Sequence, residues 1–337
     1  MKTLLVTGGA GFIGANFVYY WLNTYPEDRL IVLDALTYAG NRASLAQAEK
    51  NPNVEFIHAD IRDQDRVETL LVREKISTIV HFAAESHVDR SIIGPDAFID
   101  TNIIGTHSLL KAAKNNWLDQ HPQPHRFHHI STDEVYGTLK PSDPPFSEET
   151  PYAPNSPYAA SKASSDHLVR AYHETYGLEV TTSNCSNNYG PYQFPEKLIP
   201  LMIVNILHDI PIPVYGDGLQ IRDWLYVDDH NLGVDLILKK GIPGQTYNIG
   251  GNNEKRNIDI VRLVCSLMDK KLDRKTPADT LITHVTDRAG HDRRYAINAK
   301  KITQDLGYVP RTTFEQGIEK TIDWYLDNKT WWKPLVK

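Results

Sequence analysis

Short apolar segments alternate with longer, one-sided segments through the first half of the chain. The apolar segments have the length of strands, and the one-sided segments repeat apolar residues at the helical period. Strands are predicted at residues 3–7, 30–33, 54–59, 78–82, 126–130 and 179–184, and helices at residues 15–23, 64–73, 95–115 and 158–176. This alternation predicts an α/β fold with a Rossmann-type doubly wound parallel sheet.

The alternation of strands and helices stops after residue 184. A proline-rich, loop-rich region with a helix at 198–208 follows, and residues 226–239 and 247–249 then return to the strand–helix–strand pattern. Further helices are predicted at residues 258–268, 300–306 and 314–325. We therefore predict two interleaved domains. The larger comprises residues 1–184 and about 225–250, and a smaller C-terminal α/β domain comprises residues 185–224 and 251–337.

A glycine loop joins the first strand to the first helix. Gly8, Gly11 and Gly14 allow the backbone to approach a pyrophosphate, whose charge is stabilised at the helix N-terminus. Asp34 ends the next strand, twenty residues after Gly14, where a carboxylate binds a ribose diol and repels a ribose phosphate. The loop and Asp34 together predict NAD rather than NADP, although Asp34 alone is also a common turn residue.

The next two strand ends carry further candidates for the cofactor. Asp60 follows the third strand and could contact adenine, or it could cap the helix at 64–73. Ala83 and Ala84 follow the fourth strand and are small enough for a cofactor to pass. The polar run at 85–90 is predicted to be a loop that faces the reacting end of the cofactor, or else a solvated loop.

The predicted strand at 126–130 is followed by a hydroxyl and two adjacent carboxyls, Thr132, Asp133 and Glu134. Tyr158 and Lys162 lie four residues apart on the predicted helix and so share one face. A lysine ammonium beside a phenol favours the phenolate, which is a usable base for oxidation of an alcohol. Each pattern also occurs by chance or in solvated loops. Their occurrence together with the glycine loop favours a catalytic site.

Composition narrows the class of protein. Of 337 residues, 41% are hydrophobic and 23% charged, which is ordinary for globular proteins, and the net charge of −6 argues against general binding of nucleic acid. Two cysteines without a paired spacing, no signal-peptide pattern and no apolar run of membrane-span length predict a cytoplasmic protein with no membrane association. No histidine or cysteine pattern predicts a metal site.

Several residues in the irregular region could bind a second, phosphorylated ligand. The cations Lys197, Arg222 and Arg288 fall near Tyr215 and Asn257 in the predicted smaller domain. Each cation taken singly is more often a surface charge. Together they predict a pocket for a nucleotide sugar.

The chain resembles the extended short-chain dehydrogenase/reductase family over nearly its whole length. The glycine loop and Tyr158-x-x-x-Lys162 carry this resemblance. Thr132-Asp133-Glu134 is a more specific motif than these two, because sugar epimerases of this fold usually lack the acidic pair. It is typical of the members that dehydrate dTDP-glucose. Residues 81–91, 187–200 and 222–224 also resemble those members. The resemblance implies a homodimer that uses the helices at 95–115 and 158–176.

The resemblance also implies a set of binding residues. It assigns NAD to Gly8, Gly11, Phe12, Ile13, Gly14, Asp34, Thr37, Asp60, Ile61, Ala83, Ala84, Thr101, Tyr158 and Lys162. It assigns the dTDP-sugar to Ser86, Thr132, Asn187, Lys197, Leu198, Pro213, Tyr215, Arg222, Asn257, Arg288 and His291. The chain departs from the family pattern at Ala15, where serine is common, and at Ala289, where proline is common.

The implied reaction has three stages. Tyr158, assisted by Lys162 and Thr132, removes the hydroxyl proton at hexose carbon 4 as a hydride passes to NAD. Glu134 then removes the carbon 5 proton while Asp133 protonates the departing carbon 6 hydroxyl, and the hydride finally returns to carbon 6. Two alternatives remain, a nucleotide-sugar 4-epimerase and a non-enzymatic NAD-binding protein.

Overall fold

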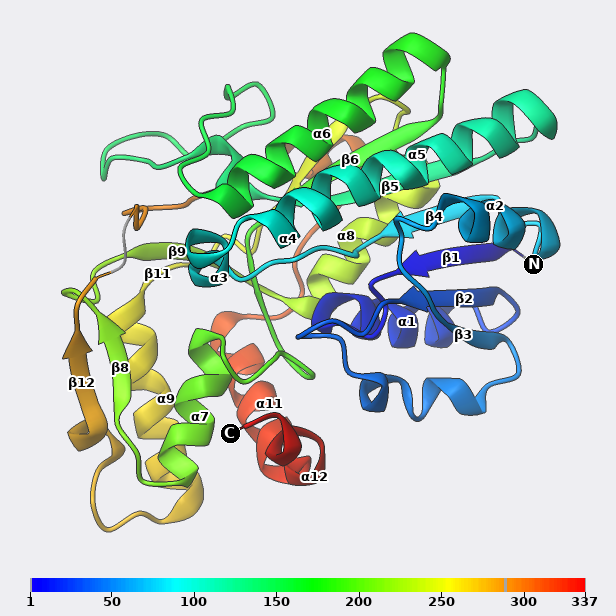
Figure 1. Ribbon diagram of the computed structural model, residues 1–337. Helices are drawn as coiled ribbons and strands as arrows, with labels where there is room; N and C mark the ends of the chain where they lie inside the picture. The colour runs from blue at the N-terminus through cyan, green and yellow to red at the C-terminus, as the bar shows by residue number, and fades with distance from the viewer. Residues whose placement is uncertain (1, 288–289, 337) are drawn as a thin grey trace.

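A parallel seven-stranded sheet forms the larger part of the computed structural model, which describes residues 2–287 and 290–336 (Figure 1). Its strands are four to seven residues long, in the spatial order β10 (Thr246–Ile249), β6 (Val180–Cys185), β5 (Arg126–Thr132), β4 (Thr78–His81), β1 (Thr3–Thr7), β2 (Arg29–Asp34) and β3 (Val54–His58). Strand order reverses on either side of β1, as in a doubly wound fold. The predicted Rossmann-type architecture is therefore confirmed.

Helices cover both faces of this sheet. Alternate strand residues point to opposite faces, so Leu4 packs in one core and Leu5 in the other. The first face is covered by α1 (Phe12–Thr24), α8 (Val227–Lys240) and α10 (Lys300–Leu306). The second is covered by α2 (Gln64–Arg73), α5 (Thr106–Lys114) and α6 (Pro157–Tyr176). In Figure 1, α5 and α6 lie side by side along the top.

The remaining elements form a second unit with its own core, seen at the lower left of Figure 1. Its strands form two small sheets, β11–β9–β7 and β12–β8, from β7 (Asn187–Tyr189), β8 (Ile212–Tyr215), β9 (Ile221–Tyr226), β11 (Glu254–Arg256) and β12 (Ile282–Val285). Its helices are α7 (Leu198–Leu207), α9 (Asn257–Leu272), α11 (Phe314–Asp327) and α12 (Lys329–Trp332).

The switch point of strand order fixes where a ligand can enter. In register, Thr7 of β1 is paired with Leu33 of β2 on one side and His81 of β4 on the other. The residues that follow, Gly8 and Asp34 among them, therefore emerge together at the carboxyl edge of the sheet. This edge is where open α/β sheets hold their ligands.

Some element boundaries differ from those predicted. The expected helix at 95–115 consists of α4 (Asp96–Phe98), α5 and two π-helical stretches, Ile99–Gly105 and Asn115–Gln120. Side-chain periodicity does not specify such i→i+5 bonding. The predicted loop at 85–90 contains the start of α3 (Val88–Ile93), because Nδ1 of His87 accepts a hydrogen bond from the amide of Arg90 (3.4 Å).

Another difference concerns the predicted boundary between domains. The sequence assigned all of 251–337 to the smaller domain, but Ile302 and Leu306 of α10 pack in the core of the large sheet. Their contacts are with α8 and β10, which are themselves part of the larger unit. Over the described ranges, none of the helices has the length and apolar character needed to cross a membrane.

Candidate active site

A cavity of about 330 Å³ lies at the carboxyl ends of β1, β2, β4 and β5. Every residue that the sequence analysis assigned to the cofactor lines it, and so do the five predicted catalytic residues. The catalytic residues are Thr132, Asp133, Glu134, Tyr158 and Lys162. Residues more than 150 positions apart, such as Gly8 and Lys162, thus border one space.

Backbone forms the floor of the cavity at the glycine loop. Gly8 has a φ of +69°, and a Cβ there would lie 2.5 Å from the amide nitrogen of Ala83. A Cβ on Gly14 would lie 2.3 Å from the carbonyl oxygen of Gly8. Gly11, the N-cap of α1, has no side chain that could cap the first turn, and Phe12, Ile13 and Gly14 of that turn line the cavity. This is the arrangement that binds a pyrophosphate.

Asp34 is fixed by the backbone beside this loop. Its Oδ2 accepts a hydrogen bond from the amide of Ala10 (2.9 Å), and its Oδ1 accepts one from Leu36 (2.8 Å). Burial raises the pKa of Asp34, and these two hydrogen bonds oppose the rise. A carboxylate held in this way is suited to accept hydrogen bonds from a ribose diol.

Asp60 does not cap α2. The N-cap of that helix is Asp63, whose side chain accepts a hydrogen bond from the amide of Arg66 (3.1 Å). Asp60 instead pairs with Arg62, at 2.7 Å between Oδ2 and Nη2, and both residues line the cavity. The helix-cap alternative for Asp60 is therefore wrong.

The two carboxyls follow β5 on a single turn of 3₁₀ helix, Asp133–Tyr136. Oγ1 of Thr132 accepts a hydrogen bond from the amide of Glu134 (3.3 Å) and begins this turn. Asp133 is 1% exposed, and burial together with the nearby charges of Glu134 and Asp223 raises its pKa well above the usual range. Burial therefore favours the protonated form of Asp133, the form that a general acid requires.

Tyr158 and Lys162 project from the first turns of α6, which is capped by Ser156 and begins at Pro157 as predicted. Nζ of Lys162 donates a hydrogen bond to the carbonyl of Ile130 (2.8 Å), and burial lowers the pKa of Lys162 to about 8. Burial and the charge of Glu134 raise the pKa of Tyr158 well above 10, while Thr132 opposes this. In the protein without cofactor, burial therefore opposes the phenolate that the sequence analysis expected Lys162 to favour.

The predicted substrate residues divide into two groups. Ser86, Asn187 and Lys197 line the cavity, and Nζ of Lys197 donates a hydrogen bond to the carbonyl of Ser86 (3.1 Å). Arg222 does not line it but lies close enough to lower the pKa of Asp133, with its guanidinium 4.2 Å from the ring centre of Tyr295.

The other group lies on the second unit, away from the cavity lining. Its members are Leu198, Pro213, Tyr215, Asn257 and His291. The rings of Tyr215 and His291 meet edge to face, 6.2 Å apart, and Nδ1 of His291 lies 2.5 Å from Oδ1 of Asp287. Arg288 lies outside the described residues, as does the departure at Ala289.

Sequence reasoning missed a clasp over the cavity, formed by Tyr38, Arg90 and Glu196. The guanidinium of Arg90 lies 4.2 Å from the ring centre of Tyr38, and its Nη2 lies 3.4 Å from Oε2 of Glu196. Phe194 meets the edge of the Tyr38 ring. The only local signal for Glu196 is a charged pair, Glu196-Lys197, inside a proline-rich loop. The remaining unpredicted lining residues are Leu33, Ala35, Ala39, Gly40, Arg62, Phe82, Ile130, Ser131, Cys185, Ser186, Asn188 and Gln193.

The fold and the cavity define a dinucleotide-binding α/β protein with a tyrosine–lysine pair and two carboxyls at one site. The chain belongs to the GDP-mannose 4,6 dehydratase family, whose model matches residues 5–321. This match confirms the family resemblance inferred from the sequence.

Individual relatives are similar over the full length. The chain is 54% identical to dTDP-glucose 4,6-dehydratase of Escherichia coli, covering 99% of this chain and 96% of the relative. A crystal structure of dTDP-glucose 4,6-dehydratase from Streptomyces venezuelae with NAD and TYD bound matches with a TM-score of 0.91 at 46% identity, covering 99% and 100% of the two chains. A UDP-glucuronic acid 4-epimerase from Bacillus cereus matches with a TM-score of 0.84 at 28% identity, covering 97% and 99%.

Proposed function

We propose that this protein converts dTDP-glucose to dTDP-4-keto-6-deoxyglucose and water, with NAD as a resident cofactor. The observation that carries the proposal is the meeting of Asp133 and Glu134 with Tyr158 and Lys162 in one cavity. An epimerase needs the tyrosine, the lysine and the cofactor, but it has no use for an acid and a base that eliminate water. The identity to dTDP-glucose 4,6-dehydratases over the full length also supports dehydration.

The cavity fits NAD by its backbone. A Cβ at Gly8 or Gly14 would collide with main-chain atoms, so the closely packed loop beside the cavity requires glycine, and Asp34 is suited to a ribose diol. When bound, NAD supplies a hydride acceptor, a later hydride donor and, in its oxidised form, a positive ring charge. Because the hydride that leaves carbon 4 must return to carbon 6, the cofactor has to stay bound through the cycle. The clasp of Tyr38, Arg90 and Glu196 is placed to retain it.

Tyr158 acts as the base for the hydroxyl at carbon 4. Burial opposes the phenolate, so Tyr158 requires positive charge nearby and a hydrogen bond from Thr132. Lys162 contributes such a charge from one turn further along α6. The protein's part in this stage is thus to exclude water and to hold one proton acceptor against the hydroxyl.

Glu134 and Asp133 divide the elimination between them. Once carbon 4 is a ketone, the hydrogen at carbon 5 becomes acidic, and Glu134 removes it. Asp133, whose protonated form is favoured by burial, donates its proton to the departing hydroxyl at carbon 6. Glu134 returns its proton to carbon 5 at the end. Over one cycle Tyr158 gains one proton and Asp133 loses one, so a net transfer of one proton from Tyr158 to Asp133 through solvent restores both groups for the next cycle.

We place the sugar near Ser86, Thr132, Asn187 and Lys197, and the nucleotide on the second unit. Its candidates are Leu198, Pro213, Tyr215, Arg222, Asn257, Arg288 and His291. Oδ1 of Asn257 is buried and accepts no hydrogen bond from any residue that the structure describes, so it is available to a ligand donor. We also propose the division into an NAD-binding and a nucleotide-sugar-binding domain, with α10 assigned to the former.

Substitution of the base separates oxidation from dehydration. Glu134→Gln keeps the shape of the side chain but accepts no proton, whereas Tyr158 and Lys162 remain in place. On mixing with dTDP-glucose, this variant should form bound NADH, seen as near-ultraviolet absorbance, while product release falls by roughly two to four orders of magnitude. Tyr158→Phe should instead impair formation of NADH itself.

Exchange with heavy water completes this test. The parent should incorporate deuterium at carbon 5, and Glu134→Gln should not. Product at near the parental rate from Glu134→Gln would remove Glu134 from the role of base. A galactose isomer instead of a ketone from the parent would establish the epimerase.

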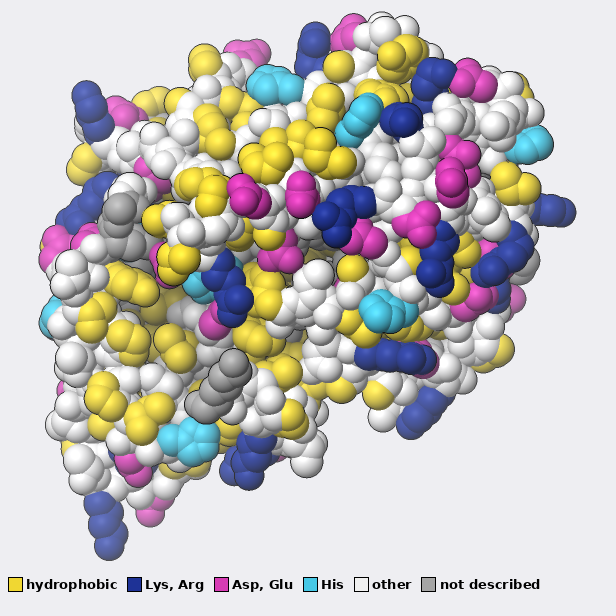
Figure 2. Space-filling view, in the orientation of Figure 1, with side chains coloured by type: hydrophobic (Ala, Val, Ile, Leu, Met, Phe, Trp, Pro, Cys, Tyr) yellow, Lys and Arg dark blue, Asp and Glu magenta, His cyan; other side chains and the backbone are white. Residues whose placement is uncertain are grey.

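A homodimer is part of the proposal. Large apolar side chains are exposed on α3 and the π-helical stretch before α5, including Ile93 (88% exposed), Ile99 and Ile104. Figure 2 shows hydrophobic side chains gathered on the upper part of this face, over α5 and α6. Burial of this surface against a second copy would stabilise a dimer.

We also propose a cytoplasmic location and a role in deoxysugar biosynthesis, with dTDP-rhamnose as an end product.

Sedimentation of three proteins tests the dimer. The parent should sediment as a dimer at micromolar concentration, and Ile93→Asp combined with Ile104→Asp should sediment as a monomer. Val309→Asp, at an apolar side chain that is 60% exposed outside this surface, is the matched control and should stay dimeric. A monomeric parent would contradict the proposal.

A further inference from the structure

A buried polar group lies behind the cavity, and no step of the proposed reaction uses it. Its centre is Asp166, one turn after Lys162 on α6 and 6% exposed. Oδ2 of Asp166 accepts hydrogen bonds from Oγ of Ser131 (2.8 Å) and from Oη of Tyr152 (3.0 Å). Oδ1 lies 3.1 Å from Nε2 of His129.

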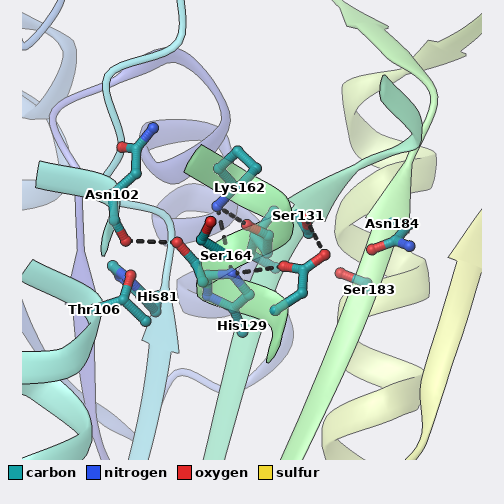
Figure 3. Close-up of polar contacts among 12 residues, drawn as sticks. His81, Asn102, Thr106, His129, Ser131, Lys162, Ser164, Ser183 and Asn184 are labelled. Carbon is teal, nitrogen blue, oxygen red and sulfur yellow. Dashed lines mark hydrogen bonds and ion pairs between the residues drawn. The ribbon is translucent and has the colours of Figure 1, made fainter. Parts of the chain in front are cut away.

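Lys162 approaches the same histidine. Its Nζ lies 3.5 Å from Nε2 of His129, so that one imidazole nitrogen is close to both the amine and the carboxylate. Figure 3 shows Lys162, His129 and Ser131 turned towards one another, from α6 and β5. The carboxylate is thus held on one oxygen by two hydroxyls, while its other oxygen faces the histidine beside Lys162.

The other ionisable groups around this pair do not balance the lysine charge. Burial lowers the pKa of His81 and His129 and raises the pKa of Cys185 to about 12, so all three are neutral near pH 7. Burial also keeps Tyr152 neutral by raising its pKa. The groups that face Asp166 or Lys162 are Tyr158 and His167 on α6, His129 and Ser131 on β5, His81 on β4, Cys185 on β6, Tyr136 after β5, and Tyr152.

We propose that Asp166 is a positioning residue for Lys162: its carboxylate, fixed by Ser131 and Tyr152, keeps the buried amine charged while Tyr158 takes the substrate proton. This inference rests on the proposed function, because it assigns Lys162 a charged role in the oxidation. The Coulombic effect of Asp166 raises the pKa of Lys162 against the lowering caused by burial. Removal of the carboxylate therefore makes Lys162 lose its proton at a lower pH.

A second cleft allows the negative charge of Asp166 to be replaced by an added anion. Asp166 and Tyr152 also line a cleft of about 810 Å³, which is bordered by His167, Arg170 and Thr182 and does not include the catalytic residues. An Asp166→Ala variant leaves a space of carboxylate size next to this cleft. A small anion such as formate has a route into that space.

Burial raises the pKa of Asp166 to about 6, so the experiment follows formation of bound NADH in a single turnover with dTDP-glucose from pH 7 to pH 9.5, where Asp166 is a carboxylate. In the parent, the rate should fall on the alkaline side as Lys162 loses its proton. In Asp166→Ala, this alkaline limb should move to lower pH by about one unit. Formate should move it back, whereas formamide, of similar shape but without charge, should not.

Two further variants serve as controls. Tyr152→Phe removes one hydrogen bond to Asp166 and leaves the charge, so its alkaline limb should stay where the parent's lies. Asp166→Asn also removes the charge but conserves the volume, so it should show the same shift of the alkaline limb. It replaces the alanine variant if that variant does not fold. A merely structural role would lower the rate equally at every pH, would not respond to formate, and would overturn the inference.

The two levels of the proposal fail differently. A parent that forms no bound NADH with dTDP-glucose at any pH contradicts the proposed function. A parent that forms it, with an unmoved alkaline limb in Asp166→Ala and Asp166→Asn, contradicts only the role of Asp166.

Discussion

The cofactor end of the cavity is built mainly from backbone. At Gly8 and Gly14 a single Cβ would collide with main-chain atoms, and Asp34 is positioned by two amides. The geometry of this end therefore depends on the main chain from β1 to the end of β2 and on its packing against the main chain of Phe82 and Ala83 after β4.

The catalytic end is built from buried ionisable side chains. Asp133, Tyr158 and Lys162 each have a pKa displaced mainly by burial, and the displacement is towards the neutral form in every case. Function at this end therefore depends on protonation, which the packing of several strands and helices sets. The cofactor end of the cavity is thus sensitive to added side-chain volume, and the catalytic end is sensitive to side-chain charge.

The largest expected effect is a change of charge without a change of volume at the catalytic end. Asp133→Asn removes the proton donor for the hydroxyl at carbon 6, so formation of product should fall by roughly two to four orders of magnitude. Bound NADH should still form. Because Glu134 is intact, carbon 5 should still exchange its hydrogen with heavy water, which distinguishes this variant from Glu134→Gln.

Mass spectrometry of quenched reactions measures the amount of product and the deuterium at carbon 5. Near-parental product from Asp133→Asn would show that another group donates the proton, and it would break the contrast between the two ends.

The second effect is a change of volume without a change of charge at the cofactor end. Gly8→Ala places a side chain at a φ of +69° and against the amide of Ala83. The conformational cost alone is about 1–2 kcal/mol, so affinity for NAD should fall roughly tenfold or more. Calorimetric titration of the NAD-free protein measures this loss.

Gly94→Ala is the matched control for this substitution. A Cβ at Gly94 meets no atom within 4 Å, and its φ of −147° suits any residue. Its affinity for NAD should equal that of the parent. Equal affinities of Gly8→Ala and Gly94→Ala would mean that the backbone of the glycine loop does not limit binding.

The smallest effect is expected at the clasp. Arg90→Ala removes an exposed ion pair with Glu196 and the contact with the Tyr38 ring, each worth about 0.2–1 kcal/mol at exposed sites. Dissociation of NAD should become roughly two- to tenfold faster. Stopped-flow fluorescence with excess competing dinucleotide measures the rate.

Arg42→Ala controls for the loss of a surface arginine. Arg42 also pairs with a glutamate, Glu49 at 2.9 Å, and lies over a ring, Phe56 at 4.7 Å, but none of the three lines the cavity. Its NAD release should match that of the parent. If Arg90→Ala behaved like Arg42→Ala, the clasp would have no part in retention.

Local motifs account for what could be predicted of the site. The glycine loop, Asp34 and the Tyr158–Lys162 pair each depend on residues close together in sequence, and the fold that they indicate is confirmed. The clasp could not be predicted in this way, because Tyr38, Arg90 and Glu196 come from three distant segments that no shared motif connects. The cap of α2 could not be predicted either: the sequence analysis considered Asp60, whereas the backbone geometry makes Asp63 the cap.

The sequence by itself determined the alternation of strands and helices, the place of the glycine loop and the spacing of Tyr158 and Lys162, because these follow from periodicity and short spacings. Only the tertiary structure decided which form of each ionisable group burial favours. Tyr158 and Lys162 are neighbours on one helix turn, and the spacing alone predicts that the lysine lowers the pKa of the phenol. Burial instead raises the pKa of Tyr158. Asp166 lies one turn after Lys162 on α6, but its contacts with Ser131 and His129, and the approach of Lys162 to the same histidine, exist only in the folded protein, since burial and Coulombic interactions depend on all neighbours in space.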